Sequence, residues 1–243
     1  MLEVEGLVKT FGGFTAVNRV SFGLRQGEIL GLIGPNGSGK STLFNLISGA
    51  LPPTAGSVRF EGREIGGFSA NRVVRMGLAR TFQIPRPFKK LTILENVALA
   101  GYYGREDRPS QGVALEEGAR VLKIVGLPTD PEATVEGLGA AGLKKLELAR
   151  ALATKPRVLL ADESLGGLDR TEMDQAADML GRLRSEFGIT IIWVEHIMGV
   201  LMRVIDRVIV LDHGEKIFEG VPADAVRDPR VVEVYLGGSM AKH

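Results

Sequence analysis

Apolar runs of strand length recur along the chain and alternate with stretches of helical periodicity. Glu28–Ile33, Val158–Ala161 and Ile189–Val194 are short and almost continuously apolar, which is typical of strands that are buried on both faces. Thr42–Ser48 and Arg170–Phe187 have the apolar spacing of helices. This alternation predicts an α/β fold with a parallel sheet covered on both faces.

Shorter elements flank these runs. Leu2–Val8 and Val17–Leu24 are predicted strands of an N-terminal antiparallel β subdomain, separated by a turn at Gly12–Gly13. His213–Gly214 predicts the turn of a hairpin near the other end of the chain. The other predicted elements are a strand at Ser57–Phe60, a helix at Phe68–Met76, a strand at Leu78–Phe82, hairpin strands at Arg207–Leu211 and Lys216–Glu219, and two short C-terminal helices.

The pattern becomes mostly helical between residues 89 and 154, apart from a polar loop predicted at Tyr102–Gly112. We therefore expect one domain over residues 1–243. Residues 1–88 and 155–220 would form its α/β core, 89–154 an inserted helical subdomain, and 221–243 a C-terminal helical tail.

Composition limits the class of protein. Apolar residues make up 44% of the chain and charged residues 24%, which is ordinary for a soluble globular protein. The net charge of +1 gives no electrostatic footprint for nucleic acid, so we expect no nucleic-acid partner. No apolar run approaches the about 18 residues that span a bilayer, and the first residues lack the features of a secretory signal. Without cysteine, disulfides and thiolate metal sites are excluded, and a cytosolic location is allowed.

A glycine-rich segment follows the first buried strand and precedes the first helix. Gly34, Gly39, Lys40 and Ser41 fit the phosphate-loop pattern G-x-x-x-x-G-K-[ST]. In this context backbone N–H groups and a helix N-terminus face an anion, Lys40 is suited to the β- and γ-phosphates, and the Ser41 hydroxyl to Mg²⁺. The alternative is a glycine-rich turn that only caps a helix. We predict the RecA-like core of a P-loop NTPase, with a nucleotide site at Asn36, Gly37, Ser38, Gly39, Lys40, Ser41 and Thr42.

Two carboxylates end the apolar strand Val158–Ala161. Ligands bind at the C-terminal ends of parallel strands, so Asp162 is a candidate to support Mg²⁺ and Glu163 a candidate general base for an attacking water. Two adjacent acids alone are a weak signal, since a solvated strand end often carries them. The phosphate loop in the same chain favours the functional interpretation.

With these motifs the chain resembles the ATP-hydrolysing subunits of ATP-binding cassette transporters over nearly its whole length. Ser164–Asp169 is similar to the family segment D-E-P-x-x-G-L-D, with Ser164 in place of the usual proline. The resemblance implies that Gln83 contacts Mg²⁺ and senses the γ-phosphate, that His196 contacts the γ-phosphate, that Phe11 stacks on adenine, and that Val17 lies near the ribose. The alternatives are a surface amide for Gln83, a core or capping role for His196, and plain packing for Phe11.

The amino-acid sequences of two segments are more similar to one branch of this family than to the others. Gly77–Gln83 and Asp228–Gly237 resemble the ATPase subunits of branched-chain amino acid importers, a branch that also serves urea and related small polar solutes. The identity of the solute therefore stays open. Residues 83–90 contain Pro85, Pro87 and Phe88, and the resemblance implies that they dock a cytoplasmic helix of the channel subunit; a solvated loop is the alternative.

One motif departs from the family pattern. The signature that is usually L-S-G-G-Q is here Leu138-Gly139-Ala140-Ala141-Gly142. In the family two cassettes pack head to tail, and the signature serine of one binds the γ-phosphate held by the other. Gly139 has no hydroxyl, and losing one such donor costs on the order of 3 kcal/mol, or about a hundredfold in rate. We expect a heterodimer that keeps one good site, with a homodimer of two weakened sites as the alternative.

The expected function is ATP binding and hydrolysis, with ATP and Mg²⁺ as cofactors, in a subunit peripheral to the inner face of the cell membrane. Lys40, Glu163 and His196 are the expected catalytic residues, and Ser41, Gln83 and Asp162 the metal residues. The expected partners are a second ATPase subunit, transmembrane permeases and, indirectly, an extracytoplasmic solute-binding protein. Two other functions remain open: a soluble cassette ATPase that acts on nucleic acid or ribosomes, and a weakly hydrolysing regulatory subunit. A P-loop GTPase is disfavoured because no N-K-x-D segment is present.

Overall fold

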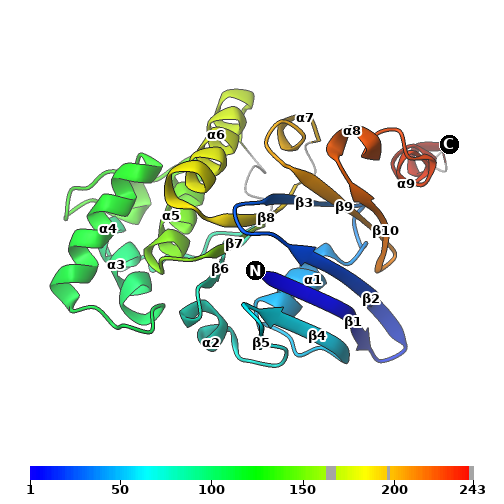
Figure 1. Cartoon of the computed structure of the whole chain (residues 1–243). Helices are drawn as coiled ribbons and strands as arrows, with labels where there is room; N and C mark the ends of the chain where they lie inside the picture. Colours follow the sequence, from blue (N-terminus) through cyan, green and yellow to red (C-terminus); the bar gives the residue numbers. More distant parts are fainter. Residues whose placement is uncertain (163–167, 196–197, 241–243) are drawn as a thin grey trace. The chain divides into compact units, whose positions relative to one another are not determined.

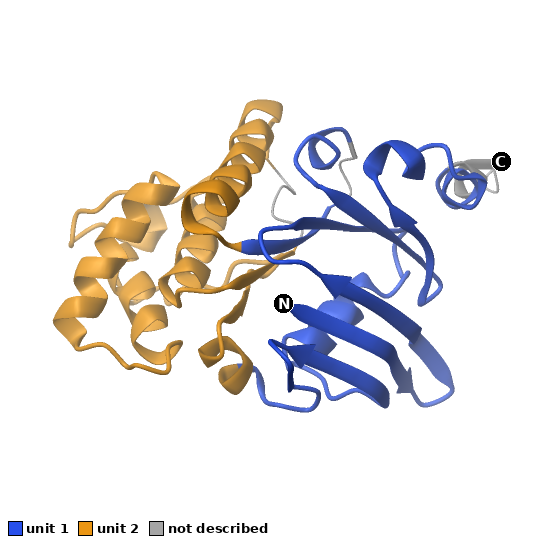
Figure 2. Cartoon of the chain, viewed as in Figure 1, with its two compact units in different colours: residues 1–70, 190–243 blue, residues 71–189 orange. Residues whose placement is uncertain are grey.

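The computed structural model describes residues 1–162, 168–195 and 198–240 (Figure 1). The chain divides into two compact units (Figure 2). Unit 1 consists of Met1–Ala70 and Thr190–His243, and unit 2 of Asn71–Ile189. Among the described residues every helix is too short or too polar to cross a bilayer.

An antiparallel sheet begins unit 1. It contains β1 (Leu2–Phe11), β2 (Phe14–Leu24), β4 (Ala55–Phe60) and β5 (Arg63–Glu64), in the order β2-β1-β4-β5. The first two strands extend closer to the predicted turn at Gly12–Gly13 than the sequence indicated, since β2 begins at Phe14.

The parallel strands of unit 1 position the phosphate loop. β3 (Ile29–Ile33) pairs in parallel with β8 (Thr190–Val194) on one side and β9 (Arg207–Asp212) on the other. β9 continues as a hairpin into β10 (Glu215–Gly220). Every residue of β3 and β8 is buried, which explains why both are continuously apolar in sequence.

Among the described residues of unit 1, α1 follows the phosphate loop, and α7, α8 and α9 lie in the last part of the chain (Figure 1). α1 buries the four apolar side chains that predicted it, Leu43, Phe44, Leu46 and Ile47. The bounds are α1 (Lys40–Ile47), α7 (Met198–Leu201), α8 (Pro222–Ala225) and α9 (Pro229–Met240).

Unit 2 combines a parallel strand pair with most of the helices. β6 (Leu78–Arg80) pairs with β7 (Val158–Asp162) in the register Leu78 to Val158. The helices are α2 (Ala70–Arg75, whose first residue belongs to unit 1), α3 (Ile93–Tyr103), α4 (Gln111–Val125), the 3-10 turn η1 (Val135–Gly137), α5 (Ala140–Ala153) and α6 (Arg170–Phe187).

Local signals explain where the helices of unit 2 begin. α3 and α6 start with capping boxes, Thr92 with Glu95 and Asp169 with Glu172. α3, α4 and α5 pack against one another and lie within the range 89–154 predicted to be helical. The loop predicted at Tyr102–Gly112 is shorter at both ends, because α3 continues to Tyr103 and α4 begins at Gln111. The division into core, helical subdomain and tail stays a prediction.

Candidate functional site

The phosphate loop joins β3 to α1 and closes tightly on itself. Gly34 and Gly39 have φ angles of 153° and 104°. A Cβ on Gly34 would lie 2.2 Å from the Leu211 carbonyl oxygen, and one on Gly39 would lie 2.5 Å from the Ala16 carbonyl oxygen. Neither position therefore has room for a side chain. Glycine allows the backbone amides to curve around a ligand where any other residue would disturb β9 or β2.

The Lys40 ammonium group lies inside this loop. Its Nζ donates to the carbonyl oxygens of Gly34 at 2.8 Å and Pro35 at 2.9 Å, and the residue is only 5% exposed. The positive charge is thus held at the mouth of the loop, where a polyphosphate would lie. Ser38 is buried as well, and its carbonyl accepts from Gly214 N–H at 3.0 Å, so the β9–β10 turn supports the loop.

The neighbouring hydroxyl groups face outward. Ser41 is exposed, and so are Asn36 and Gly37 in the loop itself, while Thr42 is partly exposed. An accessible hydroxyl at the start of α1 is the donor that Mg²⁺ takes from a phosphate loop. The arrangement of amides, ammonium and hydroxyl fits a magnesium-bound nucleotide.

Phe11 and Val17 both belong to unit 1 and differ in exposure. Phe11 is 46% exposed, and Lys9 Nζ lies 5.2 Å from the centroid of its ring. Val17 is fully buried, and its Cγ2 would be 3.6 Å from a Cβ on Gly39. The Phe11 ring therefore has a free face for stacking, while Val17 packs beneath the loop. The predicted adenine and ribose contacts of these two residues stay predictions.

Unit 2 carries two other predicted site residues, Gln83 and Asp162. Asp162 ends β7 and is 5% exposed; its Oδ2 accepts from Arg80 Nη2 at 2.7 Å, and its N–H donates to Thr81 Oγ1 at 3.1 Å. Gln83 lies three residues beyond the end of β6 and is exposed. Both therefore follow the C-terminal ends of paired parallel strands, where a ligand site is expected. Glu163 and His196 lie outside the described residues.

The altered signature segment forms the start of α5. Gly139 is the N-cap residue, with φ −71° and ψ −177°, and no side chain caps the helix there. A Cβ on Gly139 would meet nothing within 4 Å, whereas one on Gly142 would lie 3.0 Å from Leu138 Cδ2. The structure thus has room for a serine side chain at position 139, although the sequence has glycine there.

The structure adds three residues that the sequence analysis did not single out. Lys9 lies over Phe11, and Arg80 holds Asp162. Tyr235 of α9 reaches the phosphate loop: burial raises the pKa of its phenol to about 12, and a hydrogen bond from the Gly34 backbone opposes that rise. Arg80 and Tyr235 stand in the segments Gly77–Gln83 and Asp228–Gly237 that carry the branch resemblance, so a signal was present for these two residues but not for Lys9.

Comparison with known proteins agrees with this geometry. A family model described as "ABC transporter" matches residues 17–166, and one described as "Branched-chain amino acid ATP-binding cassette transporter" matches residues 215–241. The chain is 35% identical to the high-affinity branched-chain amino acid transport ATP-binding protein BraF of Pseudomonas aeruginosa, with 98% of both proteins covered. It is 33% identical to the corresponding protein LivG of Escherichia coli over the same shares.

Solved structures give the same result. A nucleotide-free ATP-binding cassette from an ABC transporter matches with a TM-score of 0.88 and 31% identity, covering 97% of this chain and 98% of that one. A cassette in its ADP conformation matches with a TM-score of 0.88 and 32% identity, over 98% of both chains. A dimeric bacterial cassette matches with a TM-score of 0.82 and 27% identity, over 91% of this chain and 99% of that one. The predicted fold class is confirmed.

Proposed function

This chain belongs to the ATP-binding cassette family of transporter ATPases, and on that premise we propose that it powers an importer of branched-chain amino acids or a related small polar solute. The observation that carries the ATPase function is the loop of Gly34–Lys40 with its inserted ammonium group. The solute class rests on the names of relatives that match over almost the whole chain.

Each site residue has a proposed role. When bound, ATP would supply the β–γ phosphoanhydride bond that is hydrolysed, and Mg²⁺ would offset the negative charge of its phosphates. Lys40 and the loop amides bind the phosphates, while Ser41 and Gln83 contact the metal and Asp162 supports it. Glu163 takes the proton of the attacking water, and His196 holds the γ-phosphate. Arg80 keeps the Asp162 carboxylate oriented at the end of β7.

The proposed assembly has two cassettes and two membrane partners. A second cassette, packed head to tail, would complete each nucleotide site, and permease subunits would dock on residues 83–90. A solute-binding protein outside the membrane would deliver the solute. The chain would then lie on the inner face of the cell membrane. Phe82, Ile84 and Phe88 support the docking surface, because all three large apolar side chains are about half exposed or more.

One observation favours a second candidate. Gly139 offers no hydroxyl to the nucleotide of a partner cassette, which would suit a regulatory subunit that hydrolyses slowly. A heterodimer in which the partner carries an intact signature reconciles the same observation with brisk transport, and we favour it.

Glu163→Gln tests the proposed activity. We expect the purified variant to bind Mg²⁺-ATP as the wild type does and to lose nearly all turnover, because the amide cannot accept a proton. Lys40→Ala serves as the comparison and should weaken binding itself. Turnover that survives Glu163→Gln would contradict the role of Glu163. Uptake of a labelled branched-chain amino acid by cells that lack the chain tests the solute class, and unchanged uptake would contradict that class while leaving the ATPase intact.

A further inference from the structure

The segment between β6 and α3 has no regular secondary structure, yet it is held firmly in unit 2. It exposes Phe82, Ile84 and Phe88 by 53%, 68% and 48% of their surfaces. Exposed large apolar side chains that gather in one segment are typical of an interaction site. Residues of two helices, α5 and α3, hold this segment.

Glu147 of α5 holds the backbone of this segment. The residue is only 7% exposed, its Oε2 accepts from Arg150 Nη1 at 3.0 Å, and the backbone at Arg86 and Phe82 lies close enough to lower its pKa. Burial raises the pKa of Glu147, and its interactions with Arg150 and these backbone groups oppose that rise. A buried carboxylate is costly unless such partners are present, so this acid is held against the segment by Arg150 and the neighbouring backbone.

Arg150, one helical turn further along α5, makes the second hold. Its Nη1 donates to Glu147 Oε2 at 3.0 Å and to the Arg86 carbonyl oxygen at 3.0 Å. Its guanidinium carbon also lies 5.2 Å from the centroid of the Phe88 ring. A planar guanidinium can hydrogen-bond and stack on a ring at once, which an ammonium group does less well.

Asn96 of α3 holds the far end of the segment independently. It is fully buried; its Oδ1 accepts from Phe88 N–H at 2.8 Å, and its Nδ2 donates to the carbonyl oxygens of Phe88 at 3.0 Å and Thr92 at 2.9 Å. Residues 82–86 therefore depend on α5, whereas the Phe88 amide depends on α3.

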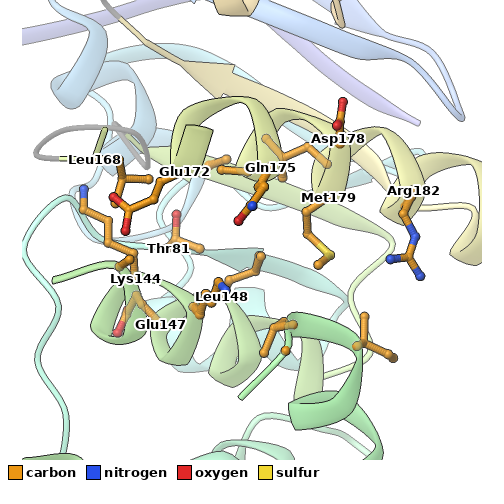
Figure 3. Close-up of a pocket in the computed structure, with 18 of the residues that line it drawn as sticks. Thr81, Lys144, Glu147, Leu148, Leu168, Glu172, Gln175, Asp178, Met179 and Arg182 are labelled. Atoms are coloured by element: carbon orange, nitrogen blue, oxygen red, sulfur yellow. The ribbon is translucent and has the colours of Figure 1, made fainter. Parts of the chain in front are cut away.

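A cavity of about 490 Å³ lies beside α5 in unit 2 and is lined from α5 by Lys144, Glu147 and Leu148 and from α6 by residues that include Glu172 and Gln175 (Figure 3). α5 thus has room on its α6 side, and this cavity extends to Thr81 and Phe82, while Arg150 bonds directly to the Arg86 carbonyl oxygen.

We propose that Glu147 and Arg150 form a latch that makes α5 and residues 82–88 move as one body. Both are positioning residues. Because α5 begins at the signature segment Gly139–Gly142, the latch would carry movement between the nucleotide of a partner cassette and the surface that docks the membrane partner. The identity of those two ends rests on the proposed function, but the latch itself does not.

Spin labels on the full chain test the latch directly. The chain has no cysteine, so Ile84→Cys and Ala140→Cys can be labelled uniquely. We expect one narrow distance distribution in the otherwise wild-type chain, and a distribution about twice as wide or wider after Arg150→Lys or Glu147→Leu. Arg120→Lys is the matched control, because Arg120 forms an exposed ion pair with Glu116 within one turn of α4, four residues apart, whereas Glu147 and Arg150 are three apart. Equal widths in the latch variants and the control would overturn the proposal.

Amide hydrogen exchange provides a readout for each residue. In Glu147→Leu the Phe82 and Arg86 amides should lose protection by about tenfold or more, while the Phe88 amide, held by Asn96, should keep it. Equal loss at all three amides would indicate general unfolding and overturn the specific role of Glu147. Arg150→Lys, which retains the charge, is the second variant if Glu147→Leu does not fold.

Activity separates coupling from structure. Arg150→Lys should leave the affinity for Mg²⁺-ATP within about twofold of wild type and lower the stimulation of turnover by the membrane partner. Stimulation equal to wild type, with a widened distance distribution, would overturn the coupling role. If no membrane protein stimulates the wild type, the proposed function fails, while the distance and exchange results still decide whether the latch exists.

Discussion

Asp162 reaches the end of β7 already paired with a buried guanidinium. The pair formed by Arg80 and Asp162 has side-chain exposures of only 9% and 6%. At the scale of single residues this ion pair explains how a carboxylate can stay buried inside a parallel strand pair. A buried charge whose partner is removed is strongly destabilising, so the two residues depend on each other.

We expect Arg80→Met to lower the free energy of unfolding by about 3 kcal/mol, because the Asp162 carboxylate would stay buried without its partner. Urea unfolding measures this change. Arg59→Met is the control: Arg59 pairs with Glu5 on the surface, and such a pair contributes about 1 kcal/mol or less. If both variants lost a similar free energy of unfolding, the buried Arg80–Asp162 pair would contribute no more to stability than a surface pair.

Tyr235 gives a prediction about pH. The residue is 38% exposed, and partial burial of its phenol raises the pKa to about 12 from 10.0, so the folded state favours the neutral form. Its contribution to stability is therefore complete below pH 10 and is lost as the pH rises toward 12. Stability of the wild type should fall in this window more than that of Tyr235→Phe.

Ultraviolet absorbance follows the titration itself. The chain has three tyrosines, and Tyr103 is 60% exposed, so Tyr103→Phe is the matched control. The transition near pH 12 should disappear only in Tyr235→Phe. A Tyr235 phenol that ionised near pH 10 would mean that its hydroxyl group is hydrated and does not lie against Gly34 of the phosphate loop.

At the scale of elements, local pattern predicted most of this chain. The buried strands, α1, α6 and the phosphate loop all follow from short segments whose apolar spacing and glycines are visible in sequence. Pairs between distant positions had no such signal: Arg80 and Asp162 are 82 positions apart, and Arg150 and Arg86 are 64 apart. Packing in three dimensions decides those contacts, so they could not be read from periodicity.

The start of α5 allows a direct test of the altered signature. Gly139→Ser should fit without strain, because Gly139 has an extended backbone and an open space at its Cβ position. The added hydroxyl should stabilise α5 by a few tenths of a kcal/mol as an N-cap. It should also raise the turnover of a homodimer by up to about a hundredfold, because it restores one donor to the partner's γ-phosphate.

Gly139→Ala separates the hydroxyl from the Cβ atom. ATP turnover at high protein concentration is the measurement for both variants. If serine and alanine gave the same rate, the hydroxyl would have no role in the chemistry of this chain.

At the scale of the whole molecule, head-to-tail pairing predicts that two defective copies can complement each other. A copy that carries both Lys40→Ala and Gly139→Ser has a disabled phosphate loop and a restored signature. Mixed with wild type, it should create one composite site and raise turnover above that of wild type alone. Lys40→Ala without Gly139→Ser should give no such rise. If the single and the double variant both raised turnover when mixed with wild type, the proposed arrangement would be contradicted.

The β9–β10 turn links the phosphate loop to the last part of the chain. The Gly214 N–H donates to Ser38 in that loop, and the Gly214 carbonyl accepts from Asn18 N–H at 2.8 Å, while the same hairpin leads into α8 and α9. Nucleotide binding should thus change the environment of residues that follow β10. A fluorescent dye on a cysteine placed at Val226, which is 55% exposed, would turn this chain into its own optical gauge of ATP occupancy.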